Sequence, residues 1–429
     1  MNLKERLALI KSNEKNNKGN SAPRPRKMPD NWRNILPYVW IREIQGPIFI
    51  VPPFFYSGII RSVRPSERFS EQTSETEGDI DSQGSAFRIP ADRVIFFDLE
   101  TTGLSGGAGT YAFLSTTARF EGRNLVLNQV FLEDYPGERD FLSMVISQLS
   151  AGDWIASYNG ATFDIPLLRS RCILNGIVMP TRMHVDVLHD CRRFWGKILD
   201  SCSLASMEKF VLKSTREFDI PGSEIPRVWL DYVKSDFLSE NQKALMELVW
   251  QHNIMDVVSL ARLFLHIESL YRDPYRAVIE DSVDPLSLAN RICKLGRLEE
   301  AKSLLLMIYR NNKEHDLSRE IIREVQRYLA KLARKDKDLD LFSELVLSMD
   351  SEFLYGCVAK AKLFEHTFKD EKTALVWAQK AHDLACNSVN SGTIKRKDKE
   401  MAAQLSVIAS LDHRIARLER KIANRKSIP

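Results

Sequence analysis

The sequence lacks several features that would place it in a special class of protein. No apolar run in its 429 residues is long enough to cross a bilayer, and its first residues contain no hydrophobic stretch of the secretory kind. Its six cysteines include no C-x-x-C pair, which disfavours a zinc site or a disulfide scaffold. The formal net charge is only +4, so overall charge does not indicate a nucleic-acid partner. We expect a cytoplasmic protein with reduced thiols and no membrane partner.

What is present is the composition of a globular protein with more than one domain. Hydrophobic residues make up 44% and charged residues 28% of a chain that is too long for one ordinary core. Lys and Arg gather near the start and again after residue 394, where they either attract phosphate backbones or form solvated tails. We expect a basic, largely disordered leader over 1–39, a short β-rich segment over 40–64 and an acidic, Ser-rich linker over 65–87.

A mixed α/β domain is predicted over 88–275. Three strand patterns come first, and helix and strand patterns then alternate. The order β-β-β-α-β-α-β-α is typical of the ribonuclease H-like fold, with a mixed five-stranded sheet flanked by helices. The expected strands are 94–99, 111–120, 125–132, 154–158 and 181–187, and the expected helices are 138–149, 163–174, 204–212 and 241–270.

The remaining chain, 283–429, is predicted to be entirely helical. Apolar and small residues recur at helical spacing over 288–308 and again over 354–381, and the two stretches resemble degenerate tetratricopeptide repeats. A plain helical bundle is the alternative. A final amphipathic helix over 400–425 would close such an array. A repeat domain of this kind would serve to bind a protein partner.

The segment FFDLETTGL, 96–104, carries the first chemical signal. Asp98 and Glu100 follow an apolar run, and residues two apart on a strand point to the same face. Two carboxylates therefore converge at the end of a buried strand. Because unpaired buried charges are costly, such a pair favours a metal ion.

Three further motifs carry polar residues at suggestive positions. SYNGATFDIPLL places Asp164 in the first turn of a helix, where an acid is also favoured by the helix dipole alone. HNIMD places His252 and Asp256 four apart on one helix face, an arrangement that is also common on solvated helices. HVDVLHDCRRFW places His184 and Asp186 on one strand face.

Together these motifs resemble the DEDD 3′–5′ exonuclease superfamily. D-x-E-T-T-G-L is similar to its first motif, N-x4-D to its second, and a His shortly before an Asp to its third. Within it, the chain resembles the YprB family of ribonuclease H-like proteins. The loop REFDIPGSEIP and the repeat-like region add to this likeness, which extends over about 88–385.

The resemblance implies a two-metal-ion nuclease. It implies that four carboxylates hold two divalent cations, Mg²⁺ or Mn²⁺, and that His252 positions or deprotonates the attacking water. Superfamily members that use His usually have four residues between that His and the Asp, and members that use Tyr have three. Here three residues separate His252 from Asp256, so an orienting role for His252 remains open. The implied metal ligands are Asp98, Glu100, Asp164 and Asp256.

The substrate implied by the resemblance is a single-stranded end of DNA or RNA. The contacting residues would be Thr101, Thr102, Gly103, Leu104, Asn159 and Arg192. For Arg192 and Arg193, a surface salt bridge is an equal alternative to gripping phosphate, and the SGGAG segment is at least as well explained by a tight turn. The competing functions are a non-catalytic scaffold with the same fold and a structure-selective endonuclease.

Overall fold

The computed structural model describes residues 28–56, 88–103, 109–216, 219–235, 238–311, 317–390 and 398–426. These residues divide into two compact units, with the boundary between Asp284 and Pro285. The predicted linker over 65–87 and most of the predicted leader lie outside the described residues. No described helix is both long and apolar enough to span a membrane.

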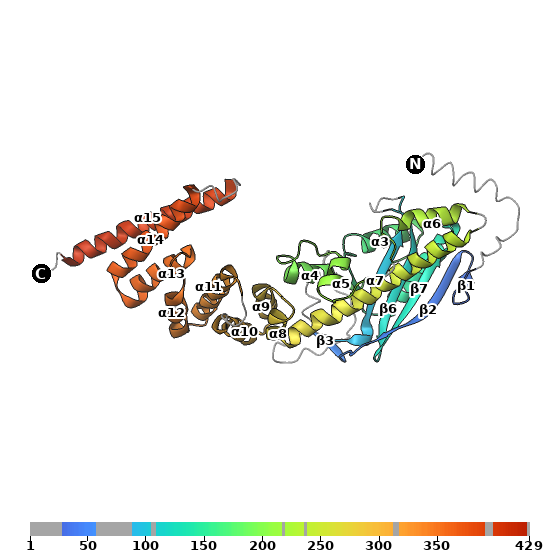
Figure 1. Cartoon of the computed structure of the whole chain (residues 1–429), viewed down its shortest axis with the longest axis horizontal. Helices are drawn as coiled ribbons and strands as arrows, with labels where there is room; N and C mark the ends of the chain where they lie inside the picture. The colour runs from blue at the N-terminus through green and yellow to red at the C-terminus, as the bar shows by residue number, and fades with distance from the viewer. Residues whose placement is uncertain are drawn as a thin grey trace. The chain divides into compact units, whose positions relative to one another are not determined.

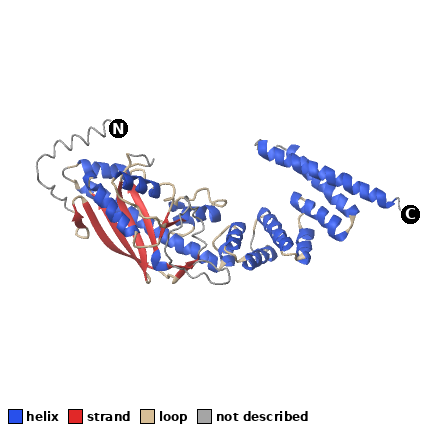
Figure 2. Cartoon of the chain, turned by 180° about the vertical axis from the view of Figure 1, so that it is seen from behind, coloured by secondary structure: helices blue, strands red, loops and turns tan. Residues whose placement is uncertain are grey.

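A seven-stranded mixed sheet forms the centre of the N-terminal unit (Figures 1 and 2). Its strand order is β1-β2-β7-β6-β5-β8-β9. The strand β5 pairs antiparallel with β6 and parallel with β8, so the pairing changes from antiparallel to parallel at β5. The strands are β1 (Arg33–Leu36), β2 (Val39–Ile48), β5 (Val94–Thr101), β6 (Ala112–Glu121), β7 (Asn124–Leu132), β8 (Trp154–Ser157) and β9 (Met183–Asp186). A separate pair consists of β3 (Phe54–Tyr56) and β4 (Arg88–Pro90).

The sheet is larger than the five strands that the sequence predicted. The five predicted strands are present, but β1 and β2 extend the sheet beyond β7, and β2 pairs with β7 along most of its length. The first described strand, β1, thus lies within the stretch predicted as a largely disordered leader. The physical reason is local apolar burial, which the basic average composition of 1–39 conceals: Trp32 and Val39 are buried, and Trp32 packs against Phe131 and Trp250.

Helices cover both faces of this sheet. On β6 the neighbouring residues Thr116 and Thr117 point to opposite faces; Thr116 bonds to Asn253 of α7, and Thr117 bonds to Gln148 of α2. The long helix α7 therefore covers one face, which it crosses in Figure 1, and α2 covers the other. The helices of this unit are α2 (Glu138–Leu149), α3 (Asp164–Leu174), α4 (Val187–Trp195), α5 (Leu204–Phe210), α6 (Ile225–Lys234), α7 (Glu240–Arg272) and α8 (Pro274–Ile279).

Local sequence explains how α7 starts and how it is held. Ser239 and Gln242 form a reciprocal capping box, which satisfies two backbone N–H groups at the first turn. Farther along, Phe264 packs edge-on against Phe96 of β5, with ring centres 5.3 Å apart. The face of β5 that carries Phe96 therefore points to α7. From β5 to α4 the elements follow in the predicted order β-β-β-α-β-α-β-α.

The C-terminal unit is helical throughout its described residues, as the sequence predicted. Small side chains let its helices pack closely: Ala361, Ala374 and Ala378 are fully buried beside Leu418. The buried Glu365 bonds to Arg414, Arg417 and Lys421, which fixes the last helix on the turn that follows α13. The helices are α9 (Pro285–Lys294), α10 (Leu298–Arg310), α11 (Arg319–Lys335), α12 (Leu339–Ser348), α13 (Leu354–Leu363), η4 (Phe364–Phe368), α14 (Glu371–Asn390) and α15 (Asp398–Lys426).

Candidate metal centre

Asp98 and Glu100 lie at the end of β5, on the face that α7 covers. They alternate with the buried Phe97 and Leu99, and so share the face of Phe96. Both carboxylates are half-buried. Asp98 stands opposite Thr116 in the β5–β6 register. The convergence that the sequence predicted for this pair therefore has a structural basis in the central strand.

Asp164 is brought to the site by the turn that follows β8. Asn159 adopts a left-handed backbone with φ of 64°, and Gly160 follows where a Cβ atom would lie 2.7 Å from Ser157 Cβ and 3.0 Å from Asp164 Oδ2. Only glycine fits this close approach. The turn leads directly into α3, whose first residue is Asp164, and this side chain is buried.

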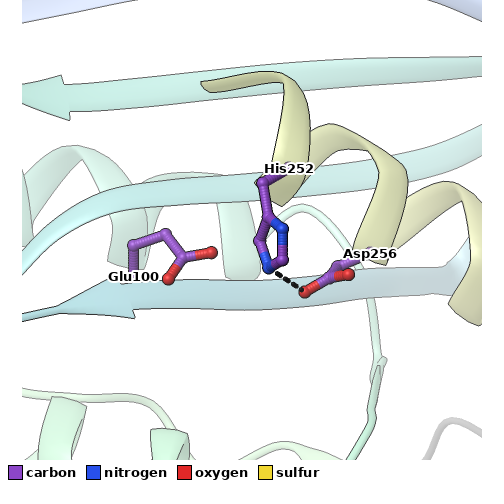
Figure 3. Close-up of side chains that lie close together, drawn as sticks. All are labelled: Glu100, His252 and Asp256. Atoms are coloured by element: carbon purple, nitrogen blue, oxygen red, sulfur yellow. Dashed lines mark ion pairs between the residues drawn. The ribbon is translucent and has the colours of Figure 1, made fainter. Parts of the chain in front are cut away.

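His252 and Asp256 project from neighbouring turns of α7 toward Glu100. One ligand atom from each of the three residues lies within 4.8 Å of the other two. Figure 3 shows the three side chains close together. His252 Nε2 is 3.4 Å from Asp256 Oδ2. The spacing of four residues places both side chains on one helix face. The three residues form a group that could hold a cation, as carboxylate oxygens and imidazole nitrogens do in proteins.

Electrostatic coupling joins all four acids. Burial raises the pKa of Asp98 well above its usual range, and the charges of Asp256, Asp164 and Glu100 raise it further. The pKa of Glu100 is also raised, first by burial and then by Asp256 and Asp164. Burial and the neighbouring Asp186 and Asp256 raise the pKa of Asp164 to about 7. The site thus concentrates more negative charge than the protein alone neutralises.

Asn253 connects the acids to a buried polar chain, a role that the sequence reading missed. Its Nδ2 donates to Asp98 Oδ2 at 2.6 Å, and its Oδ1 accepts from Thr116 Oγ1. Gln129 in turn donates to Thr116 Oγ1 at 2.8 Å, and the buried Arg42 donates to Gln129. The available signal was a polar residue between His252 and Ile254 on the apolar side of α7.

The loop that begins at Arg216 also reaches the site. Arg216 Nη2 donates to Asp256 Oδ1 at 2.5 Å and to Glu208 Oε1 at 2.6 Å. Asp219 Oδ1 lies 2.6 Å from His252 Nδ1. Arg216 and Asp219 both belong to the segment REFDIPGSEIP, but the sequence alone gave neither of them a predicted role.

Asp186 supports the turn and lies apart from the group of Figure 3. It accepts hydrogen bonds from the backbone N–H groups of Asn159, Ala161 and Leu188, and it is buried. Asp186 thus makes structural hydrogen bonds to the backbone. Because Asp186 fixes the turn before Asp164, it positions that acid through the backbone.

The residues expected to contact a substrate end come from two segments of the described chain, one directly after β5 and one that includes Asn159 and Arg192. Thr101 Oγ1 donates to the Gly103 carbonyl, and Thr102 Oγ1 accepts from the Tyr111 N–H, so both hydroxyls shape the backbone after β5. Leu104 and most of SGGAG lie outside the described residues.

Asn159 and Arg192 line a pocket of about 720 Å³ together with Tyr158, Leu188 and residues 196 and 199–204. Arg192 is exposed, whereas Arg193 pairs with the buried Asp190. Arg193 therefore makes the salt bridge, and Arg192 lines the pocket.

Known proteins match this chain over the sheet-containing domain and beyond it. A family model described as "RNase_H superfamily" matches residues 95–268. The chain is 29% identical over 339 residues to a protein of Bacillus subtilis (strain 168) named "Uncharacterized protein YprB", and the match covers 78% of this chain and 76% of that one. These matches confirm the predicted likeness to ribonuclease H-like proteins and to YprB.

A solved structure that resembles the chain is the family B DNA polymerase from the hyperthermophilic archaeon Pyrobaculum calidifontis. The match has a TM-score of 0.30 and 17% sequence identity. It covers 53% of this chain and 30% of the polymerase, so the present chain spans less than a third of that protein.

Proposed function

We propose that this chain, whose residues 95–268 belong to the RNase H superfamily, is a metal-dependent nuclease that hydrolyses phosphodiester bonds. The observation that carries the proposal is the convergence of four acids from β5, α3 and α7, with His252 beside them. Burial, and then the neighbouring carboxylates, raise the pKa values of Asp98, Glu100 and Asp164, so added positive charge would favour their ionised forms. Divalent cations would supply that charge.

The donor set fits Mg²⁺ or Mn²⁺. Four carboxylates offer hard oxygen ligands, and no cysteine belongs to the group of ligand atoms found among the described residues. Asp98, Glu100, Asp164 and Asp256 would hold two such ions. When bound, the ions would polarise the phosphodiester and stabilise the charge that develops on its oxygens.

His252 is proposed to act on the attacking water. The contact with Asp219 favours the tautomer whose Nδ1 carries the proton, and this leaves Nε2 as the acceptor on the side of Asp256. In hydrolysis the water oxygen would attack phosphorus and His252 Nε2 would take the water proton. The bond between phosphorus and the leaving 3′ oxygen would break, and that oxygen would gain a proton from solvent.

A single-stranded end of DNA or RNA is the proposed substrate, degraded from 3′ to 5′. The resemblance to DEDD exonucleases supports this direction. The pocket lined by Asn159 and Arg192 supports a path for the nucleic acid from the acids past Arg192. The exposed guanidinium of Arg192 can pair with a phosphate. Thr101 to Gly103 would contact the terminal nucleotide from the other side. The helical C-terminal unit is proposed to bind a protein partner.

The test is hydrolysis of labelled single strands. Wild-type protein with Mn²⁺ or Mg²⁺ should release mononucleotides from 3′ ends, whereas Asp98→Asn should lower the rate at least about 100-fold, because it removes a central carboxylate. Glu121→Gln is a matched control, since Glu121 is an exposed acid paired with Arg119. Equal rates for wild type and Asp98→Asn on both DNA and RNA would refute the nuclease and favour a scaffold. Cleavage of circular single strands would instead identify an endonuclease.

A further inference from the structure

The loop between α5 and α6 places a guanidinium group against one of the proposed metal ligands. Arg216 contacts Asp256 Oδ1 through Nη2 at 2.5 Å. Arg216 belongs to the sequence segment REFDIPGSEIP, of which the nuclease proposal uses only Asp219. Its side chain is 12% exposed, so the contact is formed largely out of water, where it is stronger than on the surface.

Two acids outside the metal-binding set hold Arg216 in place. Glu208 of α5 is buried and accepts from both Nε and Nη2 of Arg216, in the paired geometry typical of arginine and carboxylate. Asp219 accepts from Nη1 at 3.1 Å. The guanidinium is thus anchored before it meets Asp256, and lysine could not reproduce this fork of donors.

The anchored guanidinium determines how Asp256 presents its carboxylate. Its bond to Oδ1 restricts rotation of the group and leaves Oδ2 on the side of His252 Nε2. Asp219, which also binds Arg216, contacts His252 Nδ1 on the opposite edge of the ring. One ion network therefore orients both α7 residues that face Glu100. Partners of this kind raise metal affinity by removing the freedom that a ligand loses on binding.

We infer that Arg216 is a positioning residue for Asp256 that strengthens divalent-cation binding. The inference rests on the proposed metal centre but does not require that the chain hydrolyse nucleic acid. It opposes a simple competition model, in which the arginine charge would repel the incoming ion. The two models predict opposite changes when the arginine is removed.

Calorimetric titration of the full chain with Mn²⁺ distinguishes them. Arg216→Gln should bind Mn²⁺ about 10–100-fold more weakly than wild type, and Arg216→Lys should also bind more weakly, because charge alone does not restore the fork. Glu208→Gln keeps the arginine but loosens its anchor, and should also lower the affinity for Mn²⁺. Arg227→Gln is the matched control: Arg227 lies on α6, is largely exposed and pairs only with Asp231 among the described acids.

Unchanged or tighter Mn²⁺ binding by Arg216→Gln would overturn the inference, as would the absence of Mn²⁺ binding by wild type. If Arg216→Gln does not fold, Glu208→Gln and Arg216→Lys decide by the same criterion. Saturating Mn²⁺ should also restore most of the rate lost by Arg216→Gln, which damage to the fold would not allow. If Arg216→Gln binds Mn²⁺ more weakly but the wild type hydrolyses no nucleic acid, the nuclease proposal fails and the inference about Arg216 stands.

Discussion

Replacing Asp164 with asparagine should stabilise the metal-free protein at high pH. Asp164 is only 5% exposed, and its carboxyl pKa is raised from 3.8 to about 7, mainly by burial. A raised pKa means that the folded state binds the proton more tightly than the unfolded chain. The folded protein therefore loses stability as pH rises from about 4 to about 7 and the acid becomes charged.

The magnitude follows from the size of the shift. About three pKa units at about 1.4 kcal/mol each give roughly 4 kcal/mol of lost stability at pH 8. Asparagine is neutral at every pH and nearly the same size. In EDTA, the free energy of unfolding of Asp164→Asn should thus exceed that of wild type by up to about 4 kcal/mol at pH 8. This difference should shrink toward zero near pH 4.

Equilibrium unfolding in urea, followed by tryptophan fluorescence, measures this difference. Six of the seven tryptophans lie before residue 285, so the signal mainly reports the N-terminal unit. Addition of Mn²⁺ at 100 times its Kd should stabilise wild type by about 2.7 kcal/mol and the variant by less, which narrows the gap. The control Glu121→Gln should stay within about 0.5 kcal/mol of wild type at each pH. A variant that is less stable than wild type at pH 8 in EDTA, or a difference independent of pH, would refute the reasoning.

Two further substitutions test the supports of the site. Asn253→Leu removes the donor to Asp98 and the acceptor of Thr116, and should lower metal-free stability by about 2–3 kcal/mol at pH 8 in the same urea assay; a change below 0.5 kcal/mol would contradict the role of the buried polar chain. Asp186→Asn directs amide hydrogens at backbone N–H groups that need an acceptor. It should lower the free energy of unfolding by about 1–3 kcal/mol. It should also weaken Mn²⁺ binding, because the turn before Asp164 is displaced. Loss of stability with unchanged Mn²⁺ affinity would show that the turn does not position the acid.

The parts of the fold that were predictable have strong local signals. The five strands from β5 to β9 and the helices α2, α3 and α7 follow from hydrophobic periodicity, and Asp98 and Glu100 follow from alternation on a strand. The strand β1 was obscured because its few apolar residues stand beside a basic stretch, whereas β2 lies almost wholly within the segment 40–64 that was predicted to be β-rich. The strand β2 is stabilised by long-range pairing with β7, and Trp32, next to β1, packs against Trp250 of α7; no local window contains either partner.

The supporting residues of the site could not be predicted, for a related reason. Asn253 acts through Asp98, which is 155 positions away in sequence, and Arg216 acts through Asp256, which is 40 positions away. Neither contact has a characteristic spacing. The acids were visible because a metal centre demands one residue type, whereas many polar side chains can support a carboxylate.

The unusual spacing of His252 becomes intelligible once Asp219 is included. Three intervening residues place the imidazole directly beside Asp256, with its two nitrogens between two carboxylates. A histidine in that position could have rotated its ring to bind either acid through either nitrogen. The contact between Nδ1 and Asp219, an acid held by Arg216, selects one orientation and turns Nε2 toward the cluster. The base proposed for this chain therefore depends less on the distance along α7 than on the loop that begins at Arg216, and Asp219→Asn should lower kcat while Mn²⁺ affinity changes far less than in Arg216→Gln.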